Sequence, residues 1–295
     1  MQPAFTLDVL NTTSRSEFAA ALGDIFEHAP WVAESAYLKR PFATVTALHE
    51  AMLAALAAAS PETTTAFLNN HPNLAGPAAR PRNLTAASER EQSIAGLDEL
   101  TVEETARLSR WNAQYRERFG FPFIICARRH SHDSIFAEFQ RRAVRDAEDE
   151  RRAALSEIAR ISALRLYERV DGPGKPKVHG RLSTHLLDTA RGVAAAGVAV
   201  QLFVLSKTGS ARLVAEAMID DDGRTPQPLI ATRPIPIGTY ELRFAIGDYL
   251  ATWSGADIRS FLDIVPIRFG VAEPEAHYHI PLLFTPWSYS TYRGS

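Results

Sequence analysis

The chain has 295 residues, 46% hydrophobic and 22% charged, which is the composition of a globular protein with enough apolar material for more than one core. A formal net charge of −2 excludes the strongly basic balance of proteins that bind nucleic acid or an anionic membrane. The single cysteine, Cys126, excludes an intramolecular disulfide. Because we see no signal peptide and no apolar run long enough to span a bilayer, we expect a cytoplasmic protein without membrane partners.

Glycine divides the chain into two parts, with four glycines in residues 1–166 and twelve in residues 167–295. Proline, glycine and lysine crowd residues 169–177, which predicts a flexible linker. We therefore predict a multidomain protein, with an all-α domain over residues 1–168 and an all-β sandwich over residues 178–295.

The helix prediction for the first part rests on apolar periodicity and on helix caps. A capping box, Thr101 with Glu104, begins one helix, and Gly120 ends it. A single long helix is predicted from Asp133 to about Tyr167, and we interpret its charged residues 145–152 as a solvated face. An earlier segment places four apolar side chains on one stripe: Phe18, Leu22, Ile25 and Phe26.

After the linker, the period of hydrophobicity changes to two. Tyr240, Leu242 and Phe244 alternate with Glu241 and Arg243, as expected when one face of a strand is buried. Turn residues separate several such segments, which is typical of a β-sandwich or small barrel. Strands are expected at residues 198–205, 212–219, 239–246, 262–269 and 277–284.

Three segments of the second part concentrate polar residues: "LSTHLLDTARG" from Leu182, "DDGRTPQPL" from Asp221, and "HYHIPLLFTPWSYSTYRGS" from His277. In this order they resemble the 5-hydroxyisourate hydrolases of the transthyretin-like family, and the final "YRGS" is the most specific element. The resemblance covers residues 178–295 and implies a transthyretin-like sandwich that hydrolyses 5-hydroxyisourate. It implies catalytic roles for His185, Arg224, His279 and Ser295. It also implies that Tyr292 holds the substrate.

The chemistry of these residue types suits ring opening at a cyclic acyl–nitrogen bond. Histidine can transfer protons near neutral pH, and arginine keeps the positive charge that an oxyanion needs. Less specific interpretations stay open: His277 as an outer-strand neighbour, Arg224 as an idle turn residue, or zinc binding by His185 with the His277–His279 pair. We expect no metal, because no cysteine or carboxylate completes a recognisable ligand set.

Five segments of the first part, among them "GDIFEHAPWVAE", "HPNLAG", "LTAASEREQSIAGLDEL" and "YRERFGFPFIICARRH", are similar in order to another family. That family is 2-oxo-4-hydroxy-4-carboxy-5-ureidoimidazoline (OHCU) decarboxylase, and the similarity spans roughly residues 5–166. The family is all-helical and uses no cofactor. Asn73 and Pro77 depart from the aspartate and lysine that the family commonly has there, but neither is the expected proton donor.

This second resemblance implies catalytic roles for His71 and Glu91, with His71 as the acid that protonates carbon after carbon dioxide leaves. It implies that other residues bind the substrate: Pro72, Ser88, Gln92, Arg165 and the backbone of Phe123, Ile124, Ile125, Cys126 and Ala127. Residue spacing alone gives a simpler interpretation, because Ser88 and Glu91 stand at capping-box spacing and Glu91 could merely cap a helix.

The two resemblances predict a bifunctional enzyme of urate breakdown that forms S-allantoin, with reaction order opposite to chain order. The alternative is a transthyretin-like ligand-binding or scaffold protein in which only one domain is active. The expected partners are the two small-molecule substrates. Family resemblance also implies a homo-oligomer, with dimers of the decarboxylase domain and tetramers of the transthyretin-like domain.

Overall fold

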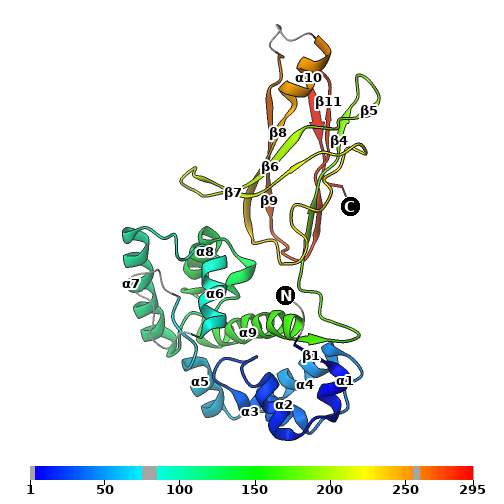
Figure 1. Ribbon diagram of the computed structural model, residues 1–295. Coiled ribbons are helices and arrows are strands. Elements are labelled where there is room, and N and C mark those ends of the chain that lie inside the picture. The colour runs from blue at the N-terminus through cyan, green and yellow to red at the C-terminus, as the bar shows by residue number, and fades with distance from the viewer. Residues whose placement is uncertain (1–3, 75–84, 255–259, 295) are drawn as a thin grey trace. The chain divides into compact units, whose positions relative to one another are not determined.

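A computed structural model describes residues 4–74, 85–254 and 260–294. The chain forms two compact units, one made of residues 1–128 and 135–178 and the other of residues 129–134 and 179–295. Coiled ribbons dominate the first unit and arrows the second (Figure 1). A helical region followed by a strand-rich sandwich confirms the predicted fold class.

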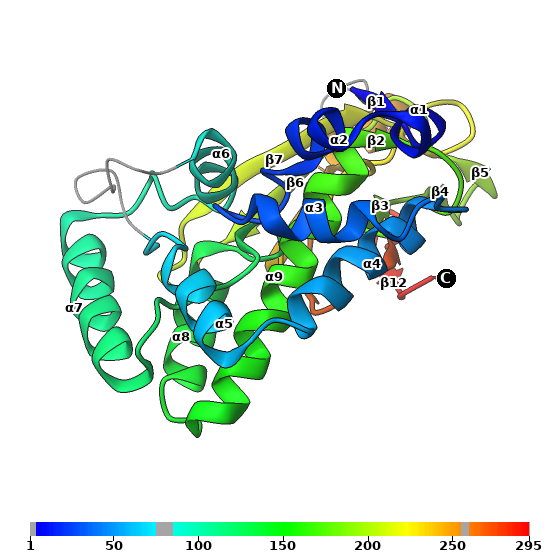
Figure 2. The same ribbon diagram turned by 90° about the horizontal axis from the view of Figure 1, so that it is seen from below.

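The helices of the first part range from 6 to 23 residues in length. In chain order they are α1 Leu7–Thr12, α2 Arg15–Leu22, α3 Pro30–Tyr37, α4 Val45–Ala57, α5 Pro61–Asn69, α6 Ala86–Ile94, α7 Val102–Phe119, α8 His132–Arg142 and α9 Ala147–Arg169. Figure 2 shows α9 running beside α4, and the two helices are in contact.

Local sequence explains several helix boundaries. Thr101 and Glu104 form the predicted capping box, and Gly120 ends α7 with a left-handed φ of 77°. The predicted apolar stripe, Phe18, Leu22, Ile25 and Phe26, is at most 1% exposed and belongs to the core of this unit.

The prediction of one long helix from Asp133 to Tyr167 is wrong. Helix α8 ends at Arg142, and α9 begins after Asp146. The Asp146 carboxylate caps α9 by accepting a hydrogen bond from the backbone N–H of Asp149 at 2.8 Å. Nor is the charged run only a solvated face. Glu150 is fully buried and accepts a hydrogen bond from Arg142 Nε at 2.8 Å.

The first half of the predicted linker is fixed to the helical unit. Strand β2, Val170–Asp171, pairs in parallel with β1, Phe5–Thr6. The carbonyls of Pro173 and Gly174 accept hydrogen bonds from the first backbone N–H groups of α4, at 2.9 and 3.0 Å. Gly174 has a φ of 60°, and a Cβ there would lie 2.7 Å from Thr44. Residues 170–174 are therefore bonded to the helical unit and do not form a free linker.

The second unit is a sandwich of short sheets. Its strands are β3 Arg181–Ser183, β4 Leu186–Asp188, β5 Val193–Ala194, β6 Ala199–Leu205, β7 Ala211–Met218, β8 Gly238–Ala245, β9 Ile264–Val271, β10 His277–His279, β11 Leu282–Phe284 and β12 Tyr289–Thr291. The four-stranded sheets have the orders β7-β6-β8-β9 and β12-β11-β4-β5, and β10 pairs with β3. Their inward side chains form one core, as the alternation at Leu242 and Phe244 predicts.

Two details of the sandwich differ from the sequence prediction. Helix α10, Ile246–Ser254, directly follows β8, so the unit is not purely β. The strand expected over residues 277–284 is divided into β10 and β11, which belong to different sheets. His277 and His279 thus share a strand face with each other but not with Leu283.

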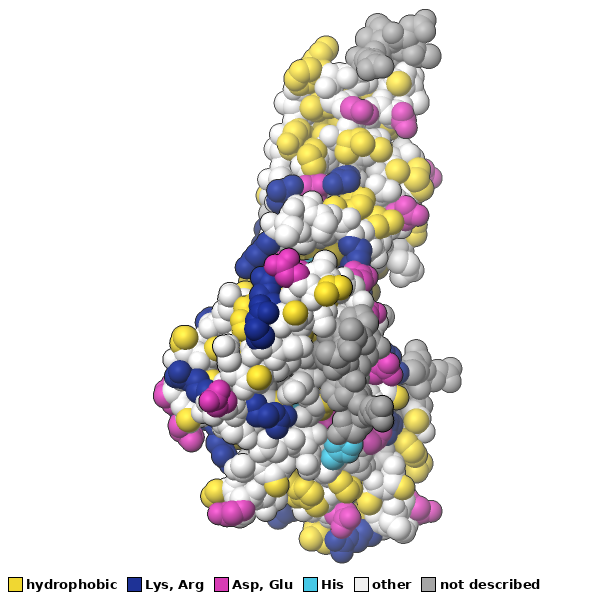
Figure 3. Space-filling view, turned by 90° about the vertical axis from the view of Figure 1, so that its left-hand side faces the viewer, with side chains coloured by type: hydrophobic (Ala, Val, Ile, Leu, Met, Phe, Trp, Pro, Cys, Tyr) yellow, Lys and Arg dark blue, Asp and Glu magenta, His cyan; other side chains and the backbone are white. Residues whose placement is uncertain are grey.

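No helix among the described residues is long and apolar enough to cross a bilayer. In Figure 3, both positive and negative side chains occur across the face of the molecule that is shown, and neither sign covers it.

Candidate active sites

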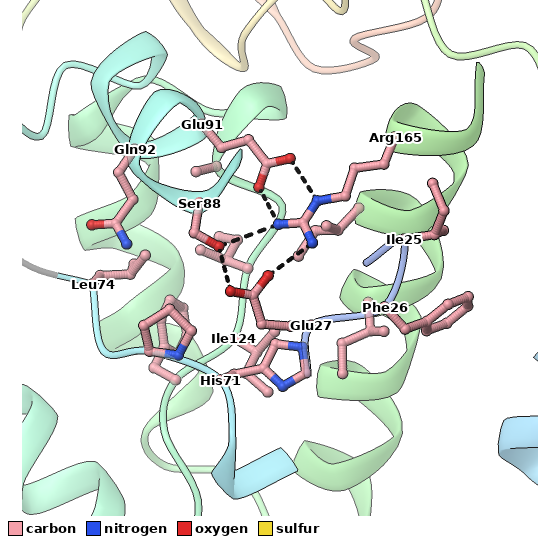
Figure 4. Close-up of a pocket in the computed structure, with 16 residues that line it drawn as sticks. Ile25, Phe26, Glu27, His71, Leu74, Ser88, Glu91, Gln92, Ile124 and Arg165 are labelled. Atoms are coloured by element: carbon pink, nitrogen blue, oxygen red, sulfur yellow. Dashed lines mark hydrogen bonds and ion pairs between the residues drawn. The ribbon is translucent and has the colours of Figure 1, made fainter. Parts of the chain in front are cut away.

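A pocket in the helical unit gathers most of the residues predicted for decarboxylation. Its walls come from the segment before α3, the segment after α5, α6, the extended segment before Ala127, and α9. The side chains that face one another across it are shown in Figure 4. The pocket is lined by Ile25, Phe26, Glu27, His71, Pro72, Leu74, Ser88, Glu91, Gln92, Phe123, Ile124, Ile125, Ala127, Ile158, Ile161 and Arg165.

Arg165 lies at the centre of the polar side of this pocket, between two carboxylates. Its Nε and Nη2 donate to the two oxygens of Glu91 at 3.0 and 2.9 Å, and its Nη1 donates to Glu27 at 2.8 Å. Its Nη2 also donates to the Ser88 hydroxyl at 3.2 Å. Burial alone would lower the pKa of Arg165, but the hydrogen bonds and charges of Glu91 and Glu27 raise it. Two carboxylates and one guanidinium leave the polar cluster with a formal charge of −1.

Glu27 is the charged residue of the pocket lining that sequence reasoning missed; the other missed lining residues are apolar: Ile25, Phe26, Leu74, Ile158 and Ile161. Glu27 is 3% exposed and accepts hydrogen bonds from the hydroxyls of Thr85 and Ser88, at 2.7 and 3.1 Å. Burial would raise the pKa of Glu27, yet the charge of Arg165 and these hydrogen bonds lower it. A single acid in the mostly apolar stretch "IFEHAPW" was the available signal, because a charge is rarely buried without a partner.

His71 borders the apolar side of the same pocket. Because a carbonyl can only accept, His71 Nδ1–H donates to the Phe67 carbonyl at 3.1 Å, and in the neutral ring Nε2 keeps a free lone pair. The ring also packs edge-on against Phe67, with 4.9 Å between centroids. Burial lowers the pKa of His71 to about 4, so the imidazole of the ligand-free pocket is neutral at pH 7.

The structure gives two other predicted residues a different environment. Helix α6 is capped by Thr85, not by Ser88, so the interpretation of Glu91 as a mere capping residue is wrong. Cys126 does not line the pocket, although its four neighbours in Phe123–Ala127 do. Its side chain packs with Leu164 and Val178. The Cys126 backbone N–H donates to Glu157 at 2.9 Å, so this amide is not directed at the pocket.

In the β unit, the turn after β7 brings Arg224 beside His185. The two residues form an isolated antiparallel bridge, and the turn carbonyl of Asp222 lies 3.0 Å from His185 Nε2. Since that carbonyl must accept, Nε2 carries the proton and the neutral His185 ring keeps a lone pair on Nδ1. Arg224 is exposed, while its backbone N–H is fixed by Asp220 and Asp222 at 3.0 Å each.

The chain end runs over the third predicted residue, His279. The Gly294 backbone N–H donates to the His279 carbonyl at 2.8 Å. A Cβ on Gly294 would lie 2.7 Å from the imidazole Cδ2, so only glycine allows this approach. Tyr292, two residues earlier, is 59% exposed. Ser295 lies outside the described residues.

His279 is close enough to the other polar groups to be affected by their charges. The pKa of His279 is lowered by burial, and further by the charges of Arg224, His277, His185 and Arg181. A neutral imidazole beside a guanidinium can accept a proton from water. No cluster of three or more His, Cys, Asp or Glu side chains is arranged to hold a metal ion in the part of the chain that the structure describes.

The two units thus define a class of protein: an enzyme with one buried acid–base pocket in a helical domain and one open histidine–arginine site on a β-sandwich. The family model described as OHCU decarboxylase matches residues 11–167, and that of the HIUase/Transthyretin family matches residues 182–294. The chain belongs to both families.

Individual relatives match each part nearly over their whole length. A 2-oxo-4-hydroxy-4-carboxy-5-ureidoimidazoline decarboxylase of Haloferax volcanii is 41% identical over 56% of this chain and 95% of the relative. A 5-hydroxyisourate hydrolase of Deinococcus radiodurans is 52% identical over 40% of this chain and 98% of the relative. A solved structure described as (S)-allantoin synthase covers 99% of this chain and 100% of its own, at 31% identity and a TM-score of 0.50.

Proposed function

We propose that the chain is a bifunctional enzyme of urate degradation. The β domain hydrolyses 5-hydroxyisourate to OHCU, and the helical domain decarboxylates OHCU to S-allantoin. The observation that carries this proposal is the joint presence of both polar sites on one chain that matches an (S)-allantoin synthase end to end. Having both sites on one chain keeps the intermediate near its next enzyme.

For hydrolysis, we assign proton transfer to histidine and charge stabilisation to Arg224. Neutral His279 takes a proton from the attacking water, and the fixed charge of Arg224 stabilises the oxyanion on the attacked carbon. The bond between His185 and the Asp222 carbonyl fixes the ring and leaves Nδ1 as an acceptor. Tyr292 and Ser295 are proposed to hold the substrate.

For decarboxylation, His71 is proposed as the proton carrier. Its unprotonated Nε2 can accept the proton of the substrate hydroxyl. It can then deliver that proton to one face of the carbon that has gained electrons from the departing carboxylate. Delivery from a fixed imidazole gives one enantiomer. The low pKa of His71 agrees with this order, in which the ring acts first as a base and then as an acid.

The structure changes the role that we assign to Arg165. Four hydrogen bonds to Glu91, Glu27 and Ser88 use four of the five N–H donors of its guanidinium, so one N–H on Nη1 is left for a substrate carboxylate. We propose that Arg165 chiefly orients Glu91 and Glu27. Their oxygens then accept hydrogen bonds from the N–H groups of the ring and the ureido chain.

We also propose a domain boundary, a location and an association. Hydrogen bonds of residues 173–174 to α4 support a helical domain that extends to Val178 rather than ending at residue 168. A fragment of residues 1–178 should then melt at a higher temperature than one of residues 1–168.

Exposed Trp287, Tyr289 and Tyr292 on and beside edge strand β12 support self-association of the β domain as a tetramer, and the helical domain is proposed to dimerise. Light scattering would measure the stoichiometry, and the location is proposed to be cytoplasmic.

The function is tested by adding the protein to urate and urate oxidase. Ultraviolet absorption follows the decay of 5-hydroxyisourate and of OHCU, and circular dichroism measures the excess of S-allantoin. We expect both decays to accelerate and the product to be optically active. Decay of both intermediates at the spontaneous rates would contradict the proposal and favour a ligand-binding protein.

A further inference from the structure

The hydroxyl of Ser183 lies between two imidazoles. It is 2.9 Å from His277 Nε2 and 3.0 Å from His279 Nδ1. Strands β3 and β10 are parallel, with Ser183 opposite His279 and Arg181 opposite His277. Because side chains two residues apart share a strand face, one hydroxyl can reach both rings.

The proton count of a hydroxyl restricts how this triad is bonded. Ser183 Oγ has one hydrogen to donate, so the two imidazoles cannot both accept from it; when the hydroxyl donates to one ring, the other ring donates to the oxygen. In one arrangement His279 Nδ1–H donates to Ser183, whose hydroxyl donates to His277 Nε2, and His279 Nε2 is free to accept a proton. In the other arrangement both bonds are reversed, and His279 Nε2 carries a proton that it can donate.

We propose that Ser183 and His277 form a proton relay that converts His279 from base to acid during hydrolysis. The proposal rests on the assignment of His279 to the hydrolytic site. As water adds to the acyl carbon, its proton moves to His279 Nε2. The Nδ1 proton passes to Ser183, and the hydroxyl proton passes to His277 Nε2. When the carbon–nitrogen bond breaks, His279 gives the Nε2 proton to the leaving nitrogen and the relay runs back.

The charge distribution supports this direction of transfer. Without a relay, His279 would become a half-buried cation near Arg224 and His185, and the pKa of His279 is lowered by burial and by those charges together with His277 and Arg181. With the relay, the positive charge appears on His277, which is exposed to water. Burial and Arg181 lower the pKa of His277 as well, but neither Arg224 nor His185 contributes there.

A purely structural role is the competing explanation, since the same bonds also join β3 to β10. Ser183 is only 8% exposed, so its loss could disturb packing without any proton transfer. The variants must therefore separate hydrogen bonding from proton transfer. Glutamine at position 277 can keep a hydrogen bond to Ser183 but cannot take up a proton.

The experiment compares full-length wild type with Ser183→Ala, His277→Gln and the control Ser210→Ala in the β6–β7 turn. Single-turnover decay of 5-hydroxyisourate is measured in water and in mixtures with heavy water. We expect the first two variants to slow the step about tenfold to a hundredfold, as for loss of a proton-transfer group. Wild type should show a curved dependence on the deuterium fraction, since several protons move together, and the two variants a linear one.

Other outcomes are equally informative. His277→Gln with the wild-type rate and the same curvature would overturn the relay, as would a Ser183→Ala variant that only weakens substrate binding. The far-ultraviolet circular dichroism and thermal melting of each variant test its folding, and unchanged OHCU decarboxylation shows that the helical unit is intact. Absence of hydrolysis in wild type itself would instead refute the proposed function.

Discussion

The two sites handle charge in opposite ways. In the helical pocket Glu27, Glu91 and Arg165 are each less than 10% exposed and pair with one another. On the β-sandwich, Arg224 and His277 are exposed and Tyr292 is 59% exposed. One site keeps its ionic groups away from water, and the other presents them to it.

The chemistry of each step accounts for this difference. Hydrolysis consumes water and moves protons between water, enzyme and leaving group, so a site open to solvent serves it. Decarboxylation needs no water, and stray protons would reach either face of the product. Burial also strengthens the ion pairs that hold the pocket residues in position.

The strongest test of the open site is removal of the tail. Deleting Tyr292–Ser295 should eliminate 5-hydroxyisourate hydrolysis and leave decarboxylation unchanged, because Gly294 lies against His279 and the described end of the chain adds little to the core. The decay rate of 5-hydroxyisourate measures the effect. Single changes grade it: Tyr292→Phe removes one hydroxyl, and Ser295→Ala removes another. Full hydrolysis by a well-folded truncation would remove the tail from the site.

The matching test of the enclosed pocket is His71→Ala. Loss of the proton carrier should slow OHCU decarboxylation by about a hundredfold or more, with hydrolysis unaffected. The yield of S-allantoin by circular dichroism is the measurement, and the rate of 5-hydroxyisourate hydrolysis by the same variant is the control. Near-normal formation of S-allantoin by the His71 variant would refute the assignment.

A smaller effect should follow from Glu27→Gln, which removes one carboxylate and keeps the shape. Arg165 would stay paired with Glu91, but its 2.8 Å charge-assisted bond to Glu27 would at best become a bond to a neutral amide oxygen, so the pocket should hold the substrate less well. We expect kcat/KM for decarboxylation to fall about tenfold, the cost of one charged hydrogen bond. Exposed Glu34→Gln is the control. An unchanged kcat/KM would mean that Glu27 only stabilises the fold.

Sequence patterns predicted the features that depend on local order. The caps at Thr101 and Gly120, the buried apolar face of β8 and the separation into two units all follow from short-range patterns, although Glu241 on the other face of β8 is buried as well. The pocket residues and the histidine–arginine set were instead expected from family resemblance.

Features that depend on distant partners were not predicted. One local feature was missed too: Asp146 caps α9 and interrupts the expected helix, but an acid within a charged run gives no such signal alone. Glu27 acquires its role from Arg165, 138 residues away in sequence. The Ser183 hydroxyl bridges two histidines only because β3 pairs with β10, and that pairing is set by the whole sandwich.

The smallest effect that we predict concerns acid stability and again contrasts the two units. Burial lowers the pKa of both His49 and His71 to about 4, whereas an unfolded chain protonates these rings below a pKa of 6.5. Their contribution to stability is therefore complete above pH 6.5 and is lost as the pH falls toward 4, because only the unfolded state binds the protons. Between pH 7 and 5.5 each histidine should lower the free energy of unfolding by about 1 kcal/mol.

Calorimetry at the two pH values would measure this loss in the helical unit. His49→Gln should flatten the pH dependence by about half without touching the pocket, because His49 bonds to Ser162 rather than to any pocket residue. A slope that survives replacement of both His49 and His71 would place the acid sensitivity in other groups. The pH dependence of the free energy of unfolding of the helical unit would then not come from its buried imidazoles.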